Sequence, residues 1–153
     1  FVNYLSVSSS NYYSWATTRC SQKEYCRSEI AQKLRVKGAA SAEIEKLLER
    51  LEAECYIDEE RYARAFVADK FRFDHWGRVK MSYALRQKGI DANIINEALA
   101  QIDEEEYRQS LADFIVSRRR TMKAASPYAL NQKIARAAIS RGFEPGMVFA
   151  VLE

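Results

Sequence analysis

The sequence contains few of the residues that build turns, with only 2 prolines and 5 glycines among its 153 residues. Strand-rich folds need many tight turns, which glycine and proline supply, so this scarcity favours helices. Long apolar runs are also missing, which argues against a membrane-spanning helix of about 20 residues. The chain is nevertheless 48% hydrophobic and 29% charged. It therefore has enough apolar side chains for a core, which excludes general disorder.

The residues that usually carry catalysis or bind metals are scarce as well. The only histidine is His75, and the three cysteines, Cys20, Cys26 and Cys55, show no Cys-x-x-Cys spacing. This pattern disfavours a zinc site and a secreted disulfide framework, and it favours reduced thiols in the cytoplasm. Glycine-rich phosphate loops and the Gly-x-Ser-x-Gly elbow are missing too. We therefore expect no catalytic residue, metal or cofactor, and interpret His75 as a turn residue.

Residues 1–10 lack the basic start and the long apolar core of a signal peptide. We expect them to form a clipped or poorly ordered leader that precedes the first repeat. The first helix is then expected to run from about residue 10 to residue 19, where Tyr12, Tyr13 and Trp15 are the main apolar residues.

Three segments of the chain resemble one another, at residues 30–38, 81–89 and 134–142. Each ends on a glycine that follows a lysine or arginine, and successive glycines lie 51 and 53 residues apart, by their positions in the chain. A glycine just past a helix adopts the left-handed conformation easily, and a cation in the last turn faces the negative end of the helix dipole. The pattern predicts three helices capped by Gly38, Gly89 and Gly142.

A second helix is expected after each of these glycines. Apolar residues recur six and ten positions later, at Ile44 and Leu48, Ile95 and Leu99, and Val148 and Leu152. A step of four residues places each pair on one helical face. Ser41 and Asp91 are suited to cap the first two of these helices, and Pro145 suits the first position of the third.

Two longer helical patterns lie between the repeated segments, at residues 58–71 and 103–123. Both begin with carboxylates and end with cations, which complements the helix dipole. Together with the helix expected near residue 15, they complete three tandem three-helix repeats, at residues 1–57, 58–102 and 103–153. The predicted fold is all-α, with about nine helices and no sheet, in an elongated, curved array of either hand.

The charge is distributed unevenly over the repeats. Residues 22–38 contain five cations against two carboxylates, residues 76–89 contain four cations and residues 124–142 contain three, the last two segments without any carboxylate. The helices that follow each glycine have a net negative charge. The same helix of every repeat is therefore basic. It forms either a cationic stripe for DNA, RNA or an acidic protein, or the ordinary solvated faces of amphipathic helices.

The middle of the chain resembles the RecX family of bacterial regulators of the RecA recombinase. The resemblance rests on Ile57-Asp58-Glu59-Glu60-Arg61-Tyr62-Ala63-Arg64-Ala65-Phe66-Val67, on Trp76-Gly77-Arg78-Val79-Lys80 and on Leu85-Arg86-Gln87-Lys88-Gly89-Ile90. It extends over about residues 22–153 and is loosest in the third repeat. The chain departs from the family pattern in the bulky link at residues 72–77 and at Ala138, where a larger residue is expected.

This resemblance implies an all-helical protein of tandem three-helix repeats without catalytic activity. It also implies binding to the RecA filament on single-stranded DNA, and we expect a monomer without membrane attachment. Such a protein blocks filament extension or promotes disassembly, and so modulates DNA repair, DNA recombination and the SOS response.

We hypothesise that the chain spans neighbouring RecA protomers as a curved clamp. The candidate contacts to RecA or DNA, chosen by charge, are Lys70, Arg72, Arg78, Lys80, Arg86, Lys88, Arg118, Arg119 and Arg120. We assign Asp58, Tyr62, Phe66, Leu85 and Gly89 to the fold. The alternative is a stand-alone helical DNA-binding module, for which the short basic helices are also suited.

Overall fold

The structure, a computed structural model, describes residues 2–153 and the side chains of residues 11–153. In this range it contains nine α-helices and no strand. The helices are α1 (Val2–Gln22), α2 (Arg27–Val36), α3 (Ser41–Ala53), α4 (Glu59–Arg72), α5 (Arg78–Gln87), α6 (Ala92–Leu99), α7 (Glu104–Thr121), α8 (Pro127–Arg141) and α9 (Pro145–Leu152). None of these helices combines the length and the apolar character that a membrane span requires.

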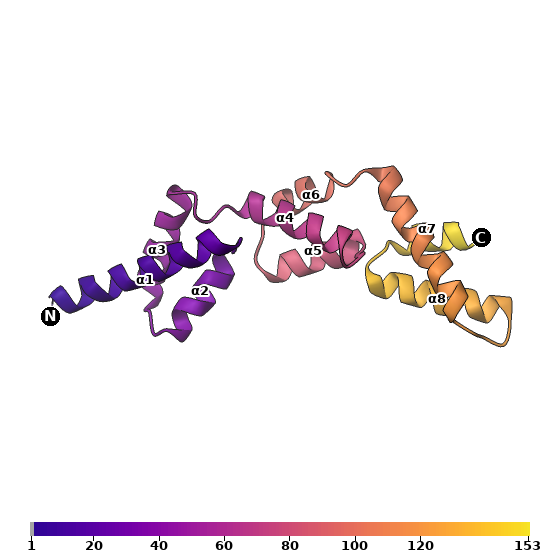
Figure 1. Cartoon of the computed structure of the whole chain (residues 1–153), viewed down its shortest axis with the longest axis horizontal. Coiled ribbons are helices and arrows are strands. Elements are labelled where there is room, and N and C mark those ends of the chain that lie inside the picture. The colour runs from indigo at the N-terminus through magenta and orange to yellow at the C-terminus, as the bar shows by residue number, and fades with distance from the viewer. Residues whose placement is uncertain (1) are drawn as a thin grey trace.

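The helices form three groups in a row, and the two ends of the chain lie at opposite ends of the molecule (Figure 1). We call them unit 1 (α1–α3), unit 2 (α4–α6) and unit 3 (α7–α9). The prediction of an elongated, all-α array of three-helix repeats is confirmed. We retain the divisions at residues 1–57, 58–102 and 103–153 as a proposal for the domain boundaries.

The predicted helix caps are largely present. Gly38, Gly89 and Gly142 have φ angles of 97°, 79° and 106°, the left-handed conformation expected of them. The Asp91 carboxylate accepts a hydrogen bond from the backbone N–H of Asn93 at 2.7 Å, and Pro145 opens α9. The local pattern of the sequence therefore determines where most helices begin and end.

Two predicted helix starts differ from the structure. Helix α1 begins at Val2 rather than near residue 10, so the expected leader is part of a helix. No proline or glycine lies between residues 2 and 22 to interrupt that helix. Helix α3 is capped by Ala40 rather than by Ser41, because the Ala40 carbonyl already accepts the first helical bond, from Ile44 N–H, at 3.0 Å.

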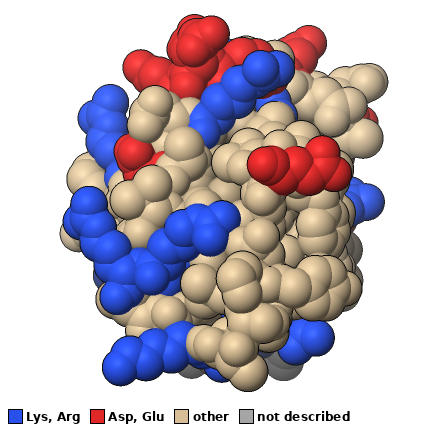
Figure 2. Space-filling view, turned by 90° about the vertical axis from the view of Figure 1, so that its right-hand side faces the viewer, with Lys and Arg blue, Asp and Glu red and all other residues tan. Residues whose placement is uncertain are grey.

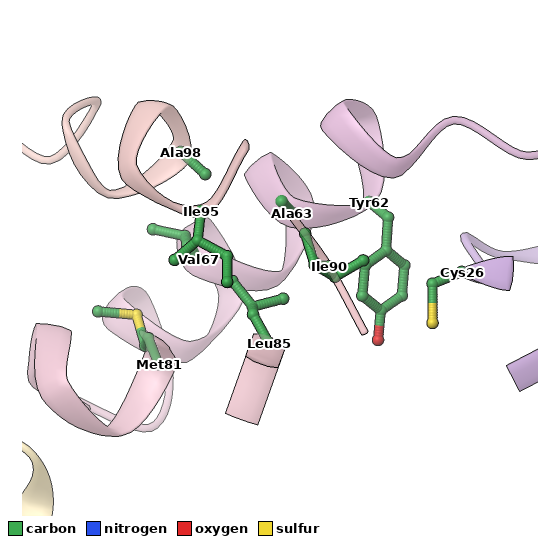
Figure 3. Packing of buried hydrophobic residues seen from close by; sticks show 9 residues of the cluster. All are labelled: Cys26, Tyr62, Ala63, Val67, Met81, Leu85, Ile90, Ile95 and Ala98. Carbon is green, nitrogen blue, oxygen red and sulfur yellow. The ribbon is translucent and has the colours of Figure 1, made fainter. Parts of the chain in front are cut away.

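Each unit has its own cluster of buried apolar side chains. In unit 2, the predicted fold residues Tyr62 and Leu85 are buried, and Cys26, the residue before α2, lies beside the Tyr62 ring (Figure 3). Phe71 and Ile102 pack against the clusters of both unit 2 and unit 3. The core is therefore continuous from one unit to the next, as tandem repeats of this size require.

The three basic helices, α2, α5 and α8, follow one another along one side of the molecule (Figure 1). The start of α5 meets the end of α8, where Gly77 N–H and Val79 N–H donate to the carbonyls of Arg141 and Gly142. The start of α2 meets the end of α5, where the Ser28 hydroxyl donates to the Lys88 carbonyl. The positive end of one helix dipole thus faces the negative end of the next.

We call these two contacts between helix ends the junctions of the molecule. The first junction joins units 1 and 2, and the second junction joins units 2 and 3. The surface of α2, α5 and α8 is called the basic row.

Candidate protein and nucleic-acid interface

Lys70 and Lys80 come together around one aromatic ring on unit 2. Their ammonium groups lie 4.8 and 4.4 Å from the centroid of the half-buried Trp76 ring. Lys70 also pairs with Asp74 at 3.1 Å. A lysine above an aromatic face keeps its remaining N–H donors free for an anion, so this cluster can bind a phosphate or a carboxylate.

Arg78 lies within the second junction. Its guanidinium donates to Glu104 at 2.6 Å and to Glu144 at 2.9 Å, and it lies 3.9 Å from the centre of the Tyr107 ring. The hydrogen bond to Glu144, together with the one to Glu104, raises the pKa of Arg78 above its ordinary value, although burial opposes the shift. Only 25% of its side chain is exposed. The structure therefore gives Arg78 partners inside the chain and favours a role in joining units 2 and 3.

The backbones of the two units also touch at this junction. A side chain at Gly77 would overlap the backbone of Gly142 and Phe143, and one at Gly142 would overlap the backbone and Cβ of Lys80. The buried Tyr107 hydroxyl accepts from Arg78 N–H at 3.0 Å and donates to Glu144 at 2.8 Å. Burial raises the pKa of Tyr107 well above that of a free tyrosine, so its hydroxyl keeps its proton and remains a donor.

Lys88 occupies the first junction. Its ammonium pairs with Glu29 at 3.2 Å, and its carbonyl accepts the bond from the Ser28 hydroxyl at 2.7 Å. Burial opposes ionisation of Glu29, but Cys26 N–H and the Lys88 ammonium outweigh it and lower the pKa of Glu29. Arg61 adds a second ion pair across the same junction, to Glu24 at 2.6 Å. Lys88 therefore holds units 1 and 2 together.

Arg72 and Arg118 line one cleft between the end of α4 and the side of α7. The cleft has a volume of about 690 Å³ and includes the aromatic side chains Phe71 and Phe114. Arg141, at the end of α8, reaches into it as a third arginine. Arg141 directly precedes the cap glycine of α8 and was not among the predicted contact residues. Its position before a glycine predicts a helix end, but it does not predict that the side chain lines a cleft.

Arg86, Arg119 and Arg120 are exposed on α5 and α7. None of them forms an ion pair among residues 11–153. Helix α7 begins with three glutamates and ends with three arginines. From the C-terminal end of the molecule, most Lys and Arg side chains gather on the lower half and most Asp and Glu side chains at the top (Figure 2). Cations thus remain available to an anionic partner on this side.

The arrangement as a whole suits binding. Exposed cations on unit 2 and unit 3 can contact phosphates or carboxylates. Within the described residues, no three His, Cys, Asp or Glu side chains lie close enough together to hold a metal ion. Of the nine predicted contact residues, the structure pairs Arg78 and Lys88 across the junctions and leaves the others on the surface or in the cleft. The basic row and the cleft are therefore the candidate interfaces.

Comparison with known proteins matches residues 58–99 to the family described as RecX, second three-helix domain. The regulatory protein RecX of Prosthecochloris aestuarii is 40% identical over 81 residues, which cover 53% of this chain and 54% of that protein. The regulatory protein RecX of Chlorobaculum tepidum is 36% identical over 118 residues, covering 77% of this chain and 71% of that protein. The chain thus spans about half the length of several of the relatives that it matches.

Solved structures share the fold. A crystal structure of regulatory protein RecX superposes with a TM-score of 0.86 at 24% identity, covering 94% of this chain and 72% of that one. The structure of RecX from Lactobacillus salivarius gives 0.81 at 20% identity, covering 94% of each chain. Together with the extended match to the Chlorobaculum tepidum protein, these similarities show that the chain belongs to the RecX family.

Proposed function

We propose that this protein is a cytoplasmic, non-enzymatic regulator that inhibits the RecA recombinase. It binds as a monomer to the RecA filament on single-stranded DNA and blocks extension of the filament or promotes its disassembly. It thereby modulates DNA repair, DNA recombination and the SOS response. Membership of a family whose relatives are named regulatory proteins supports the regulatory part of this proposal.

The observation that carries the proposal is the basic row. Three cationic helices lie end to end along one side of an elongated molecule, so positive charge recurs over its whole length. A filament presents the same anionic features at regular intervals, and a repeated cationic surface is suited to bind several of them at once. Contacts to phosphates position a protein without reading bases.

We assign the contacts to at least partly exposed cations of this row and of the neighbouring helices α4 and α7. Lys80 and Arg86 on α5 are the central pair, flanked by Lys70 on α4. Arg72 and the arginines at the end of α7, Arg118, Arg119 and Arg120, continue the surface onto unit 3. Arg78 and Lys88 act indirectly, because they hold the units in line.

The test is the ATPase activity of RecA on single-stranded DNA, with the protein added below one copy per RecA protomer. We expect inhibition at these low ratios, because one copy of a protein that spans neighbouring protomers affects several RecA protomers at once. The double variant Lys80→Glu with Arg86→Glu is expected to weaken inhibition at least tenfold.

The matched control carries the same charge change elsewhere, as Lys46→Glu on α3 with Arg108→Glu on α7. Both control residues are exposed and lie outside the basic row. Equal inhibition by the two double variants would contradict the assignment of the row. No inhibition by the unmodified protein, even at equimolar ratio, would contradict the proposed function itself.

A second candidate is a stand-alone DNA-binding module, favoured by the basic character of short helices in every unit. It requires tight binding to bare DNA that weakens steeply with salt. The proposed regulator instead binds bare DNA weakly and the RecA filament much more tightly. Fluorescence anisotropy with a labelled single strand, with and without RecA, separates the two.

A further inference from the structure

The cleft between units 2 and 3 has walls of two different kinds. One wall is the end of α4 and the following link, with Phe71, Arg72 and His75, and the other is one face of α7. Its volume is about 690 Å³, and an adjoining cleft of about 430 Å³ shares Phe71, Arg72 and Glu106 with it. The space is therefore ample for a group the size of one nucleotide.

Two arginines in the cleft are already oriented by an aromatic ring. The guanidinium carbons of Arg118 and Arg141 lie 5.0 and 5.1 Å from the centre of the Phe114 ring. Neither arginine forms an ion pair with a carboxylate in residues 11–153, and Arg141 donates a hydrogen bond to the Asp74 carbonyl at 3.1 Å. A guanidinium packed against a ring still directs N–H donors outward from its edge, in the geometry that a phosphate accepts.

The same aromatic and cationic pairing occurs in the other units. Trp15 and Arg19 on α1, like Phe66 and Lys70 on α4, repeat the spacing of four residues seen for Phe114 and Arg118. Only the third pair lines the large cleft, where Arg72 and Arg141 add positive charge. Because the pairing recurs, we interpret it as an ordinary side-chain contact on the surface of one helix in each unit. In unit 3 the pair also lines the cleft, so a ligand in the cleft can contact it.

The other end of the same wall is polar and acidic. Along α7, the cleft is lined by Glu106, Ser110 and Asp113 before it reaches Phe114 and Arg118. The Ser110 hydroxyl is buried and has no hydrogen-bond partner. At 1.5 Å per residue, Glu106 and Arg118 are separated by about 18 Å along the helix. An anionic group of a ligand is therefore favoured only at the end of the cleft with Arg118. Hydrogen-bond donors of the ligand are favoured at the other end, near Glu106 and Asp113.

We propose that this cleft binds a nucleotide, with its phosphate on Arg118 and Arg141, its base in the aromatic part of the cleft beside Phe71, and the donor groups of the base toward the Asp113 carboxylate. Bases with an exocyclic amine, such as adenine, offer donors to that acidic end, and thymine has no such amine. The proposal goes beyond the proposed function, because it concerns binding to the isolated chain. The nucleotide belongs either to a single strand or to the free nucleotide pool.

Isothermal titration of the isolated protein tests the proposal, with AMP, with TMP, with inorganic phosphate and with a five-residue oligo-dA. We expect the adenine ligands to bind at least fivefold more tightly than TMP, and inorganic phosphate to bind more weakly than either. The variant Arg118→Gln is expected to weaken AMP and oligo-dA binding at least tenfold. Its control, Arg108→Gln, at an exposed arginine of the same helix that lies outside the cleft, is expected to stay within twofold.

The two sources of the nucleotide give different results. Oligo-dA binding at least tenfold more tightly than AMP assigns the cleft to a single strand, and equal affinities assign it to free nucleotides. Equal losses in Arg118→Gln and Arg108→Gln would overturn the proposal, as would phosphate binding as tightly as AMP. So would failure of both AMP and oligo-dA to bind. Because these titrations contain no RecA, the cleft can fail while inhibition of the RecA ATPase persists.

Discussion

The two junctions use the same helix ends but different chemistry. At the first junction, units 1 and 2 meet through side chains, with the Ser28 hydroxyl on the Lys88 carbonyl and the ion pair of Lys88 with Glu29. At the second junction, units 2 and 3 meet through backbone, at 3.0 Å from Gly77 N to Arg141 O and at 2.9 Å from Val79 N to Gly142 O.

One residue position accounts for much of this difference. The residue before the middle helix is Cys26 in unit 1 and Gly77 in unit 2. The side chain of Cys26 occupies the core beside Tyr62. A side chain at Gly77 would overlap the backbone of unit 3. A glycine therefore permits direct contact of two backbones, whereas at the cysteine the contact consists of side chains: a hydroxyl, two ion pairs and the thiol packed beside Tyr62. We infer that the second junction is the more rigid of the two.

The largest effect is expected from Gly77→Ala. The added methyl group forces the second junction apart and leaves backbone N–H groups of α5 without their acceptors. We expect a loss of about 3 kcal/mol in the free energy of unfolding, from overpacking and lost hydrogen bonds. Urea denaturation followed by circular dichroism measures it.

Gly146→Ala is the control, because a side chain there meets no atom within 4 Å. We expect it to change the free energy of unfolding by less than about 0.5 kcal/mol. Equal stability of the two variants would contradict the role given to the backbone contact.

Arg78→Met removes the ionic part of the second junction. It leaves Glu104 and Glu144 without their cation, and we expect a loss of about 2 kcal/mol because the site is partly buried. The same urea denaturation measures the loss. Arg86→Met, at an exposed arginine of the same helix, should stay within about 0.5 kcal/mol of the unmodified protein. Equal losses of unfolding free energy in Arg78→Met and Arg86→Met would contradict a role for Arg78 in joining units 2 and 3.

Lys88→Met tests the first junction by the same kind of change. The Lys88 side chain is 33% exposed and has one carboxylate partner. We expect a loss of about 0.5 kcal/mol, since partly exposed single ion pairs contribute little. A thermal unfolding experiment should also show that 0.5 M NaCl reduces the difference between Lys88→Met and the unmodified protein. A loss as large as that of Arg78→Met would remove the contrast between the junctions.

Acidification should give the smallest effect, again at the first junction. The lowered pKa of Glu29 means that its ionised form stabilises the fold. That stabilisation is complete above the pKa of an unfolded glutamate, about 4.3, and is lost as the pH falls through the lower folded value. Between pH 5 and pH 3 we expect the unmodified protein to lose about 0.3 kcal/mol more than Glu29→Gln.

Glu59 provides a control of opposite sign. Burial raises its pKa, so its ionised form destabilises the fold, and protonation removes that penalty as the pH falls. Over the same pH range, Glu59→Gln should therefore lose more stability than the unmodified protein. Urea denaturation at each pH measures both variants, and a shift of the same sign in both would contradict the assignment.

The features that could be predicted from the sequence are those that depend only on residues close together in the chain. The cap glycines and the boundaries of α4 and α7 followed from local spacing, since a helix end is decided within one turn. The buried positions Ile44, Ile95 and Val148 followed from helical periodicity.

Contacts between distant residues could not be predicted in this way. Arg78 has the same charge as Arg86, but its partners lie 26 and 66 residues further along the chain. The second use of Gly142, as the close neighbour of Gly77, depends on how unit 3 packs on unit 2. Neither Phe114 nor Arg141 was a predicted contact residue, and only the position of α8 beside α7 brings them into one cleft.

The shared side chains Phe71 and Ile102 have a consequence for how the molecule melts. In an array whose units contact only their neighbours, the energy of each interface decides how far unfolding spreads. The second interface combines shared core, backbone bonds and Arg78, so units 2 and 3 are expected to lose their structure as one cooperative block. Unit 1 has the weaker interface and opens first. A partly melted molecule therefore keeps α5, α8 and the cleft intact while its N-terminal helices unfold.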